Sequence, residues 1–227
     1  MKLLNALKQL IIKYKHGLIL SYFFIYIIWF GYLERHVKTF TTIHSKLDSL
    51  IPFEEIFIIP YLMWFFFIFI TVTYLLLTSK ADFYRCCAFL FIGMTICLII
   101  YTVFPNGQDL RVDLNSLGRH NIFIDMVAAI YKVDTPANVF PSIHVFNSIG
   151  ALIAIRKNER LHKMKWLQVS AFILTVLIIL STMFLKQHST MDVLGAFALS
   201  IIMYMIVYIP AWRKVPKEAK QELTEIS

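Results

Sequence analysis

Charged residues are scarce in this chain. Only 16% of its 227 residues are Asp, Glu, Lys or Arg, whereas 59% are hydrophobic and the mean hydropathy is +0.68. An average soluble domain carries about 25% charged residues, so the composition excludes an ordinary soluble domain and predicts an integral membrane protein. The net charge of +8 does not indicate a nucleic-acid partner, because basic residues are expected in the cytoplasmic loops of so apolar a chain.

Cysteine is also rare. The chain has three, Cys86, Cys87 and Cys97, and all fall in or beside one apolar run. An odd and clustered count excludes a disulfide framework and a zinc knuckle, and we expect these residues to pack as small apolar side chains. No carboxylate cluster suited to Mg²⁺ accompanies them. The sequence therefore predicts no metal and no other cofactor.

Internal repeats, low-complexity tracts and long linkers are missing as well, which predicts a single membrane domain over residues 1–227. The first apolar run follows a basic start, as in a signal peptide. It ends in Trp-Phe-Gly-Tyr-Leu-Glu, without a small-x-small cleavage site, and we therefore expect it to be kept as a membrane span.

Most of the six apolar segments approach the roughly 20 residues that cross a hydrocarbon core. The first and the fourth are shorter and would need tilt or local thinning of the bilayer. We predict an all-α, polytopic bundle of six transmembrane helices, in which the last two form a tight hairpin across Gln187 and His188. A short interfacial helix is expected over residues 121–129. The predicted spans are 17–33, 56–78, 84–103, 139–155, 166–186 and 189–209.

Most of the 22 Lys and Arg residues lie near the chain ends and in the second and fourth connections. Because cytoplasmic segments carry the excess of positive charge, we expect both termini in the cytoplasm and the protein in the plasma membrane. The outer loops are then residues 34–55, 104–138 and 187–188. Ser142 and His144 open the fourth span from the outer side, and His188 and Asp192 open the sixth from the same side.

Ionisable side chains at membrane depth indicate a functional site. Asp192 follows His188 by four residues, so the two would share one helix face. The carboxylate can fix the imidazole tautomer and leave the other ring nitrogen free to attack. The alternative is a buried pair that only joins helices.

Three further residues could complete such a site. Pro141-Ser142 begins a helix, whose free N–H groups and dipole favour an anion, although Ser is also the ordinary cap there. His144 could protonate a leaving oxygen, or be only an interfacial polar residue. Arg111 in the second outer loop suits bidentate phosphate binding, or is an ordinary loop charge.

The order of these residues resembles the type 2 phosphatidic acid phosphatase (PAP2) superfamily of membrane lipid phosphatases and phosphotransferases. The second family motif, Pro-Ser-Gly-His, is matched with Ile143 in place of Gly. The third, Ser-Arg-x5-His-x3-Asp, is matched by Ser181, His188 and Asp192, with Thr182 in place of Arg.

The first family motif, Lys-x6-Arg-Pro, keeps only Arg111, because Phe104 and Val112 occupy the Lys and Pro positions. Two phosphate-binding cations are therefore missing, although stabilisation of transition-state charge is often the largest catalytic contribution. Lys186 is the candidate replacement, with Arg119 and Lys132 as alternatives.

The resemblance implies a role for each matched residue. His188 would attack phosphorus and form a phosphohistidine, with Asp192 orienting it. His144 would protonate the leaving group and later activate the acceptor, while Ser142 and Arg111 would hold the phosphate oxygens. No metal would be required.

Three functions remain open on the sequence. The first is hydrolysis of a lipid phosphate or pyrophosphate, such as polyprenyl pyrophosphate or phosphatidate, at the extracytoplasmic face. The second is transfer of a phospho-headgroup to an alcohol, because His188-Ser-Thr-Met-Asp192-Val resembles the His-Tyr-Thr-x-Asp-Val of sphingomyelin and inositol-phosphorylceramide synthases. The third is non-catalytic lipid binding or transport, although the spans lack the Gly/Pro interruptions of broken transporter helices. Each has a membrane lipid and the lipid bilayer as partners.

Overall fold

The computed structural model describes residue 9 and residues 12–209. The chain is mostly helical (76%), as expected for an all-α membrane protein. Both chain ends lie outside the described residues, so their cytoplasmic location and the single domain over residues 1–227 stay predictions. The α-helices in the described part are α2 (Tyr22–His36), α3 (Ile58–Thr78), α4 (Lys80–Val103), α5 (Ile122–Val133), α6 (Ile143–Lys157), α7 (Glu159–His162), α8 (Lys165–Phe184) and α9 (Thr190–Tyr208).

Short elements connect these helices. The loop after α2 and the loop after α4 meet in a two-residue parallel pair, in which β1 (Thr41–Thr42) lies beside β2 (Asn106–Gly107). The 3₁₀ helices are η1 (Lys15–Ser21), η2 (Lys46–Ser49), η3 (Glu55–Phe57) and η4 (Leu114–Leu117).

Within residues 12–209, five helical segments are long and apolar enough to cross a membrane. They correspond to five of the six predicted spans, and are Ile12–His36, Glu55–Thr78, Lys80–Val103, Lys165–Phe184 and Thr190–Tyr208. The remaining prediction, 139–155, falls on α6, which begins only at Ile143 and has 15 residues. A helix of that length rises about 22 Å, less than a hydrocarbon core of about 30 Å.

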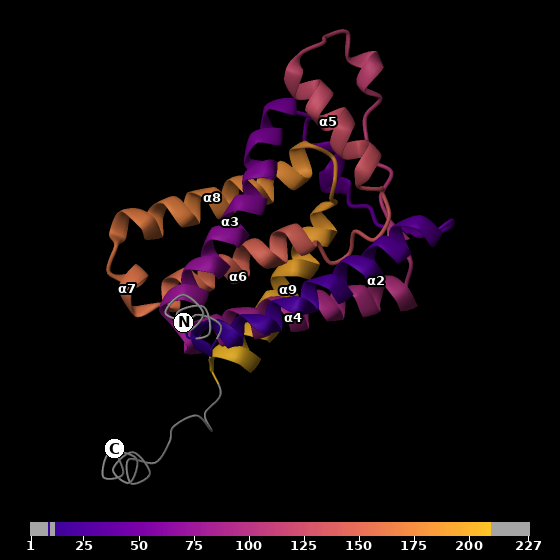
Figure 1. The fold of residues 1–227 in the computed structure, drawn as a ribbon. Helices are drawn as coiled ribbons and strands as arrows, with labels where there is room; N and C mark the ends of the chain where they lie inside the picture. Colours follow the sequence, from indigo (N-terminus) through magenta and orange to yellow (C-terminus); the bar gives the residue numbers. More distant parts are fainter. Residues whose placement is uncertain (1–8, 10–11, 210–227) are drawn as a thin grey trace, which may run out of the picture.

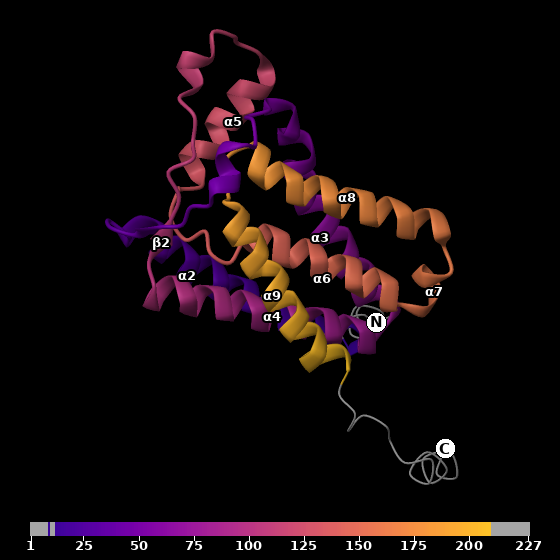
Figure 2. The same cartoon turned by 180° about the vertical axis from the view of Figure 1, so that it is seen from behind.

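Helix α6 is the centre of the bundle. It packs against α3, α4, α8 and α9, and in both views it lies between α8 on one side and α4 on the other (Figures 1 and 2). Protein rather than lipid surrounds it, so it can carry the buried polar residues Asn147 and Ser148. Its apolar content is correspondingly lower than that of its neighbours.

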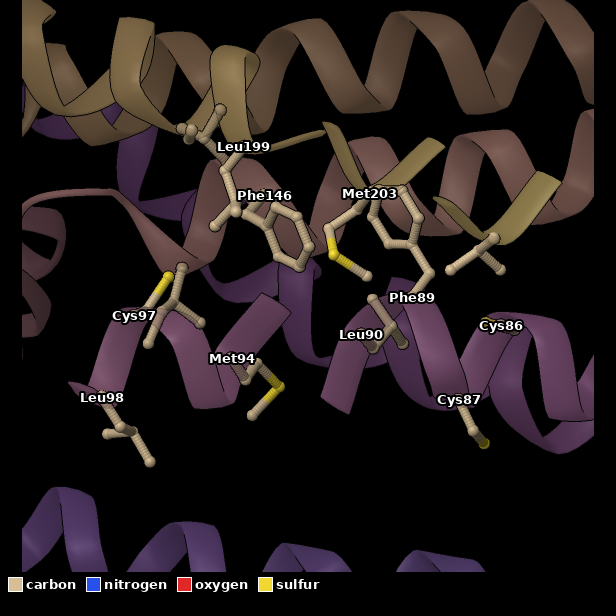
Figure 3. Packing of buried hydrophobic residues seen from close by; sticks show 14 of the residues in the cluster. Cys86, Cys87, Phe89, Leu90, Met94, Cys97, Leu98, Phe146, Leu199 and Met203 are labelled. Carbon is tan, nitrogen blue, oxygen red and sulfur yellow. The ribbon is translucent and has the colours of Figure 1, made fainter. Parts of the chain in front are cut away.

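The main core forms where α4 meets α6 and α9 (Figure 3). Phe89 of α4 stacks on Phe146 of α6 with ring centroids 4.9 Å apart. Cys86, Cys87 and Cys97 are buried in this core as free thiols, which confirms their expected packing role.

Helix direction gathers the candidate residues at one end of the bundle. Helices α6 and α9 both begin there, α8 ends there, and α5 stands over it at the top of Figure 1. We call this the site end. Helix α5 confirms the short helix expected over 121–129 and extends it to Val133, with Asn121 as its N-cap.

Candidate functional site

The His188–Asp192 pair lies at the start of α9. His188 Nδ1 is 3.3 Å from Asp192 Oδ2, and the two side chains are 7% and 0% exposed. The helix begins only at Thr190, so helical i,i+4 geometry is not what brings them together. Instead Ser189 is the N-cap and Asp192 closes a capping box, accepting the Ser189 N–H at 2.8 Å. This carboxylate thereby turns back toward His188.

His144 occupies the second position of α6 and lies near His188, with ring centroids 5.8 Å apart. Its imidazole also contacts the rings of Tyr61 at 4.8 Å and Trp64 at 4.5 Å. The structure therefore brings the two histidines together and surrounds His144 with aromatic side chains of α3.

Ser142 is fully buried at the junction of α6 and α9. Its Oγ accepts the Val145 N–H at 3.4 Å, as an N-cap does. Its own N–H donates to the Asp192 carbonyl at 3.2 Å, so the two helix starts that carry the histidines are joined directly. The capping role is present in the structure, and phosphate binding by Ser142 stays a prediction.

Arg111 reaches the site end from the loop between α4 and α5. It donates to the carbonyls of Tyr131 at 3.0 Å and Asp134 at 2.5 Å, and to Gln187 Oε1 at 2.6 Å. Burial lowers the pKa of Arg111, against the opposing charge of Asp134, and burial raises the pKa of Tyr131 to about 12. Through Gln187 the guanidinium is tied to the residue just before His188.

Lys186 has a different environment from the one expected of a phosphate-binding cation. Its ammonium donates to the carbonyls of Asp48 at 2.9 Å and Ile51 at 2.5 Å, and the residue is 8% exposed. Burial lowers the pKa of Lys186, with the charge of Asp48 opposing it. This geometry favours a structural role, which is to hold the loop between α2 and α3 against the end of α8.

Arg119 and Lys132, the two alternative replacements for the missing family cations, lie in other environments than Lys186. Arg119 forms an ion pair with Glu55, with Nη2 2.5 Å from Oε2, and Lys132 is exposed on α5. Thr182, where the family has Arg, is fully buried. Its carbonyl accepts the N–H groups of Gln187 and His188 at 2.9 and 3.0 Å, so this position shapes the turn that carries His188.

Asp48 is a buried residue that the sequence reasoning missed. Its carboxylate accepts hydrogen bonds from Ser189 Oγ at 2.6 Å, from Thr190 N–H at 2.8 Å and from the Thr190 hydroxyl. Burial alone would raise the pKa of Asp48, but these hydrogen bonds hold it below its ordinary value. A Ser45-x-x-Asp48 capping box was readable in the sequence, whereas a partner 141 residues away was not.

In the part of the chain that the structure describes, no group of three His, Cys, Asp or Glu side chains could hold a metal ion. A family model of the PAP2 superfamily matches residues 119–216. Over these residues the chain is similar to the PAP2 superfamily. No curated protein and no solved structure matches the chain.

The matched PAP2 region includes α5 to α9 and the second and third motifs, while Arg111 lies just before it. This similarity is consistent with phosphatase or phosphotransferase activity in a multi-pass membrane protein.

Proposed function

We propose that this protein is a membrane lipid phosphatase that hydrolyses a lipid phosphate or pyrophosphate through a phosphohistidine at His188. The observation that carries the proposal is the buried His188–Asp192 pair, 3.3 Å apart, beside the ring of His144 at the same end of the bundle. Two imidazoles and one carboxylate are the minimum set for nucleophile, orienting group and acid.

The first step uses the tautomer that Asp192 favours. With the His188 Nδ1–H directed at the carboxylate, Nε2 keeps its lone pair and forms a bond to phosphorus. The phosphorus–oxygen bond to the lipid breaks, and its electron pair leaves with the oxygen. His144 donates a proton to that oxygen. Aromatic rings and a second imidazole surround His144 and offer no negative charge to its protonated form. The anionic substrate supplies the charge that favours this form.

The second step returns the enzyme to its starting state. His144, now neutral, removes a proton from a water molecule while the water oxygen bonds to phosphorus. The nitrogen–phosphorus bond breaks, its electrons return to His188 Nε2, and phosphate leaves. Arg111, and the start of α6 with Ser142, are the proposed binding groups for the phosphate oxygens.

The burial of the nucleophile favours transfer to an alcohol as the second candidate. His188 is 6% exposed and Asp192 is fully buried, which limits the access of bulk water to a phosphohistidine. An acceptor alcohol carried by a second lipid would reach the site through the membrane instead. The chemistry of the first step is unchanged, and the alcohol replaces water in the second.

One assay separates the candidates. Purified protein is incubated with phosphatidate or a polyprenyl pyrophosphate, with and without an alcohol acceptor, and both free phosphate and new phospholipid are measured. Phosphate release that disappears in His188→Ala, with a phosphorylated protein trapped in the wild type, supports hydrolysis, and a new phospholipid supports transfer.

The matched control is His120→Ala, because that imidazole is 80% exposed in the outer loop and its loss should leave turnover unchanged. If neither product forms with any of these lipids while lipid binding persists, both enzymatic proposals are wrong and a non-catalytic lipid-binding or transport role takes their place.

A further inference from the structure

Gln187 carries a buried donor that the chemistry above does not use. The residue is 2% exposed, and its Nε2 has no hydrogen-bond partner among the described residues. Nearly all buried polar side-chain atoms in native proteins are paired, so a buried unpaired N–H group calls for a specific partner.

The orientation of this amide is fixed by chemistry. Arg111 has only donors, so the atom that faces its Nη2 at 2.6 Å must be the amide oxygen of Gln187. The NH₂ group is therefore turned away from the guanidinium. The Gln187 backbone is held as well, since its N–H donates to the Thr182 carbonyl at 2.9 Å.

Gln187 lies immediately before His188, and its partner Arg111 has a second buried donor, Nε, that is also without a partner among the described residues. Two linked side chains thus hold unused N–H groups beside the proposed nucleophile. A phosphoryl group, with several acceptor oxygens on one phosphorus atom, is the ligand chemistry that can use both.

We propose that the side-chain amide of Gln187 donates a hydrogen bond to a phosphoryl oxygen of the substrate, as a neutral substitute for a missing family cation. The inference rests on the proposed function for the identity of the substrate, but phosphate binding can be measured without turnover. Gln187 has no counterpart in the family motifs that match this chain.

The test is a double-mutant cycle read by phosphate binding. Wild type, Gln187→Met, Arg111→Met and the double variant are melted at increasing concentrations of inorganic phosphate, and the rise in melting temperature gives the dissociation constant. Gln187→Met should weaken phosphate binding by about ten- to a hundredfold, as expected for a hydrogen bond to a charged group.

The cycle separates direct binding from support of Arg111. If Gln187 binds phosphate itself, Gln187→Met weakens binding again in the Arg111→Met background. If it has no further effect there, Gln187 acts only by holding Arg111 and the inference is overturned. Gln187→Glu, which keeps an oxygen for Arg111 and so preserves the fold, should also weaken binding.

The matched control is Gln168→Met, because both acceptors of the Gln168 amide, the carbonyls of Ile155 and Leu161, lie at the opposite end of the bundle. It should leave phosphate binding unchanged. If the wild type forms neither free phosphate nor a new phospholipid from lipids, but binds phosphate more tightly than Gln187→Met does, the proposed function is refuted and this inference is supported. If Gln187→Met keeps full turnover, with phosphate affinity and KM unchanged, only the inference is refuted. The Gln187 amide N–H would then donate to a buried water.

Discussion

Two site residues have a task in folding as well as one in the proposed chemistry. Ser142 caps α6, and Asp192 closes the capping box of α9. A loss of activity on substitution is therefore informative only when stability is measured on the same sample. Asp192 is the clearest case, because one carboxylate serves both the helix and the imidazole.

Asp192→Asn should lower kcat by about two to four orders of magnitude, as when the carboxylate partner of a catalytic histidine becomes an amide. The amide can donate to His188 Nδ1 and so favour the tautomer whose Nε2 carries the proton. Turnover and melting temperature are measured together. The control is Asp109→Asn, whose side chain is 69% exposed. Wild-type kcat in Asp192→Asn would refute the orienting role.

The local pattern of the site could be read from the sequence, and its long-range contacts could not. His188 and Asp192 are four residues apart, and Ser142 and His144 share one helix start, so spacing predicted that each pair lies together, although a capping box at Ser189 rather than a shared helix face joins His188 to Asp192. The acceptors of the Lys186 ammonium lie 135 and 138 residues away, so the sequence could not show them. Charge and proximity to His188 suggested phosphate binding, but the ammonium is satisfied by loop carbonyls.

Helices α4 and α6 approach so closely that glycine is required at the contact. A Cβ on Gly93 would lie 2.0 Å from Cζ of Phe146, and a Cβ on Gly150 would lie 2.7 Å from Cδ1 of Phe89. Each glycine of one helix thus receives an aromatic ring of the other, as small residues do at helix contacts in membranes. The stacked Phe89 and Phe146 rings depend on both.

Gly93→Ala should lower the free energy of unfolding by about 1–3 kcal/mol, because the added methyl group overpacks the contact with Phe146. The control is Gly31→Ala in α2, where a Cβ would meet nothing within 4 Å. Gly31→Ala should be neutral or slightly stabilising. Unfolding of both variants in detergent is followed by far-UV circular dichroism, and equal stabilities would contradict the packing argument.

The loop between α2 and α3 is joined to the start of α9 through Asp48. Asp48→Ala removes the acceptor for Ser189 and Thr190 and should lower the free energy of unfolding by about 3 kcal/mol, the order expected for lost hydrogen bonds to a buried charge. The same melting experiment measures it, with Asp109→Ala as the exposed control. A melting temperature within one degree or so of wild type would show that the loop is held by other contacts.

The carboxylate of Asp48 should also make the stability of the protein depend on pH. Because the pKa of Asp48 is lower in the folded protein than its ordinary value of 3.8, its stabilising contribution is complete above that value. It is lost as the pH falls through the folded pKa. The difference in melting temperature between wild type and Asp48→Asn should therefore be constant near neutral pH and shrink below about pH 4. A difference that grows in acid would contradict this sign.

The helices of the bundle follow the pattern of apolar segments in the sequence, except for α6 at the centre. Five predicted spans appear as long apolar helices, because lipid contact demands apolar side chains along their whole length. Helix α6 is enclosed by α3, α4, α8 and α9, and the first four residues of its predicted span, 139–142, form a bent loop that leads into the helix instead. An apolar segment therefore predicts that a helix is present, but not whether lipid or other helices surround it.

Orientation in the membrane is testable with single cysteines, because the three native cysteines are buried. Ser116→Cys at the site end should react with a membrane-impermeant maleimide in intact cells. Lys163→Cys, between α7 and α8, should react only after permeabilisation. The reverse pattern would place the site on the cytoplasmic side and contradict the charge-based prediction.

The shortness of α6 has a consequence for where a lipid would meet the site. Arg156 and Lys157 end this helix and belong at a water interface. From there its other end reaches about 22 Å across a hydrocarbon core of about 30 Å. Ser142 and His144 then sit about 8 Å below the opposite boundary of the core. A lipid phosphate would have to sink beneath the headgroup plane, and lipids whose headgroups resist such immersion would be poor substrates.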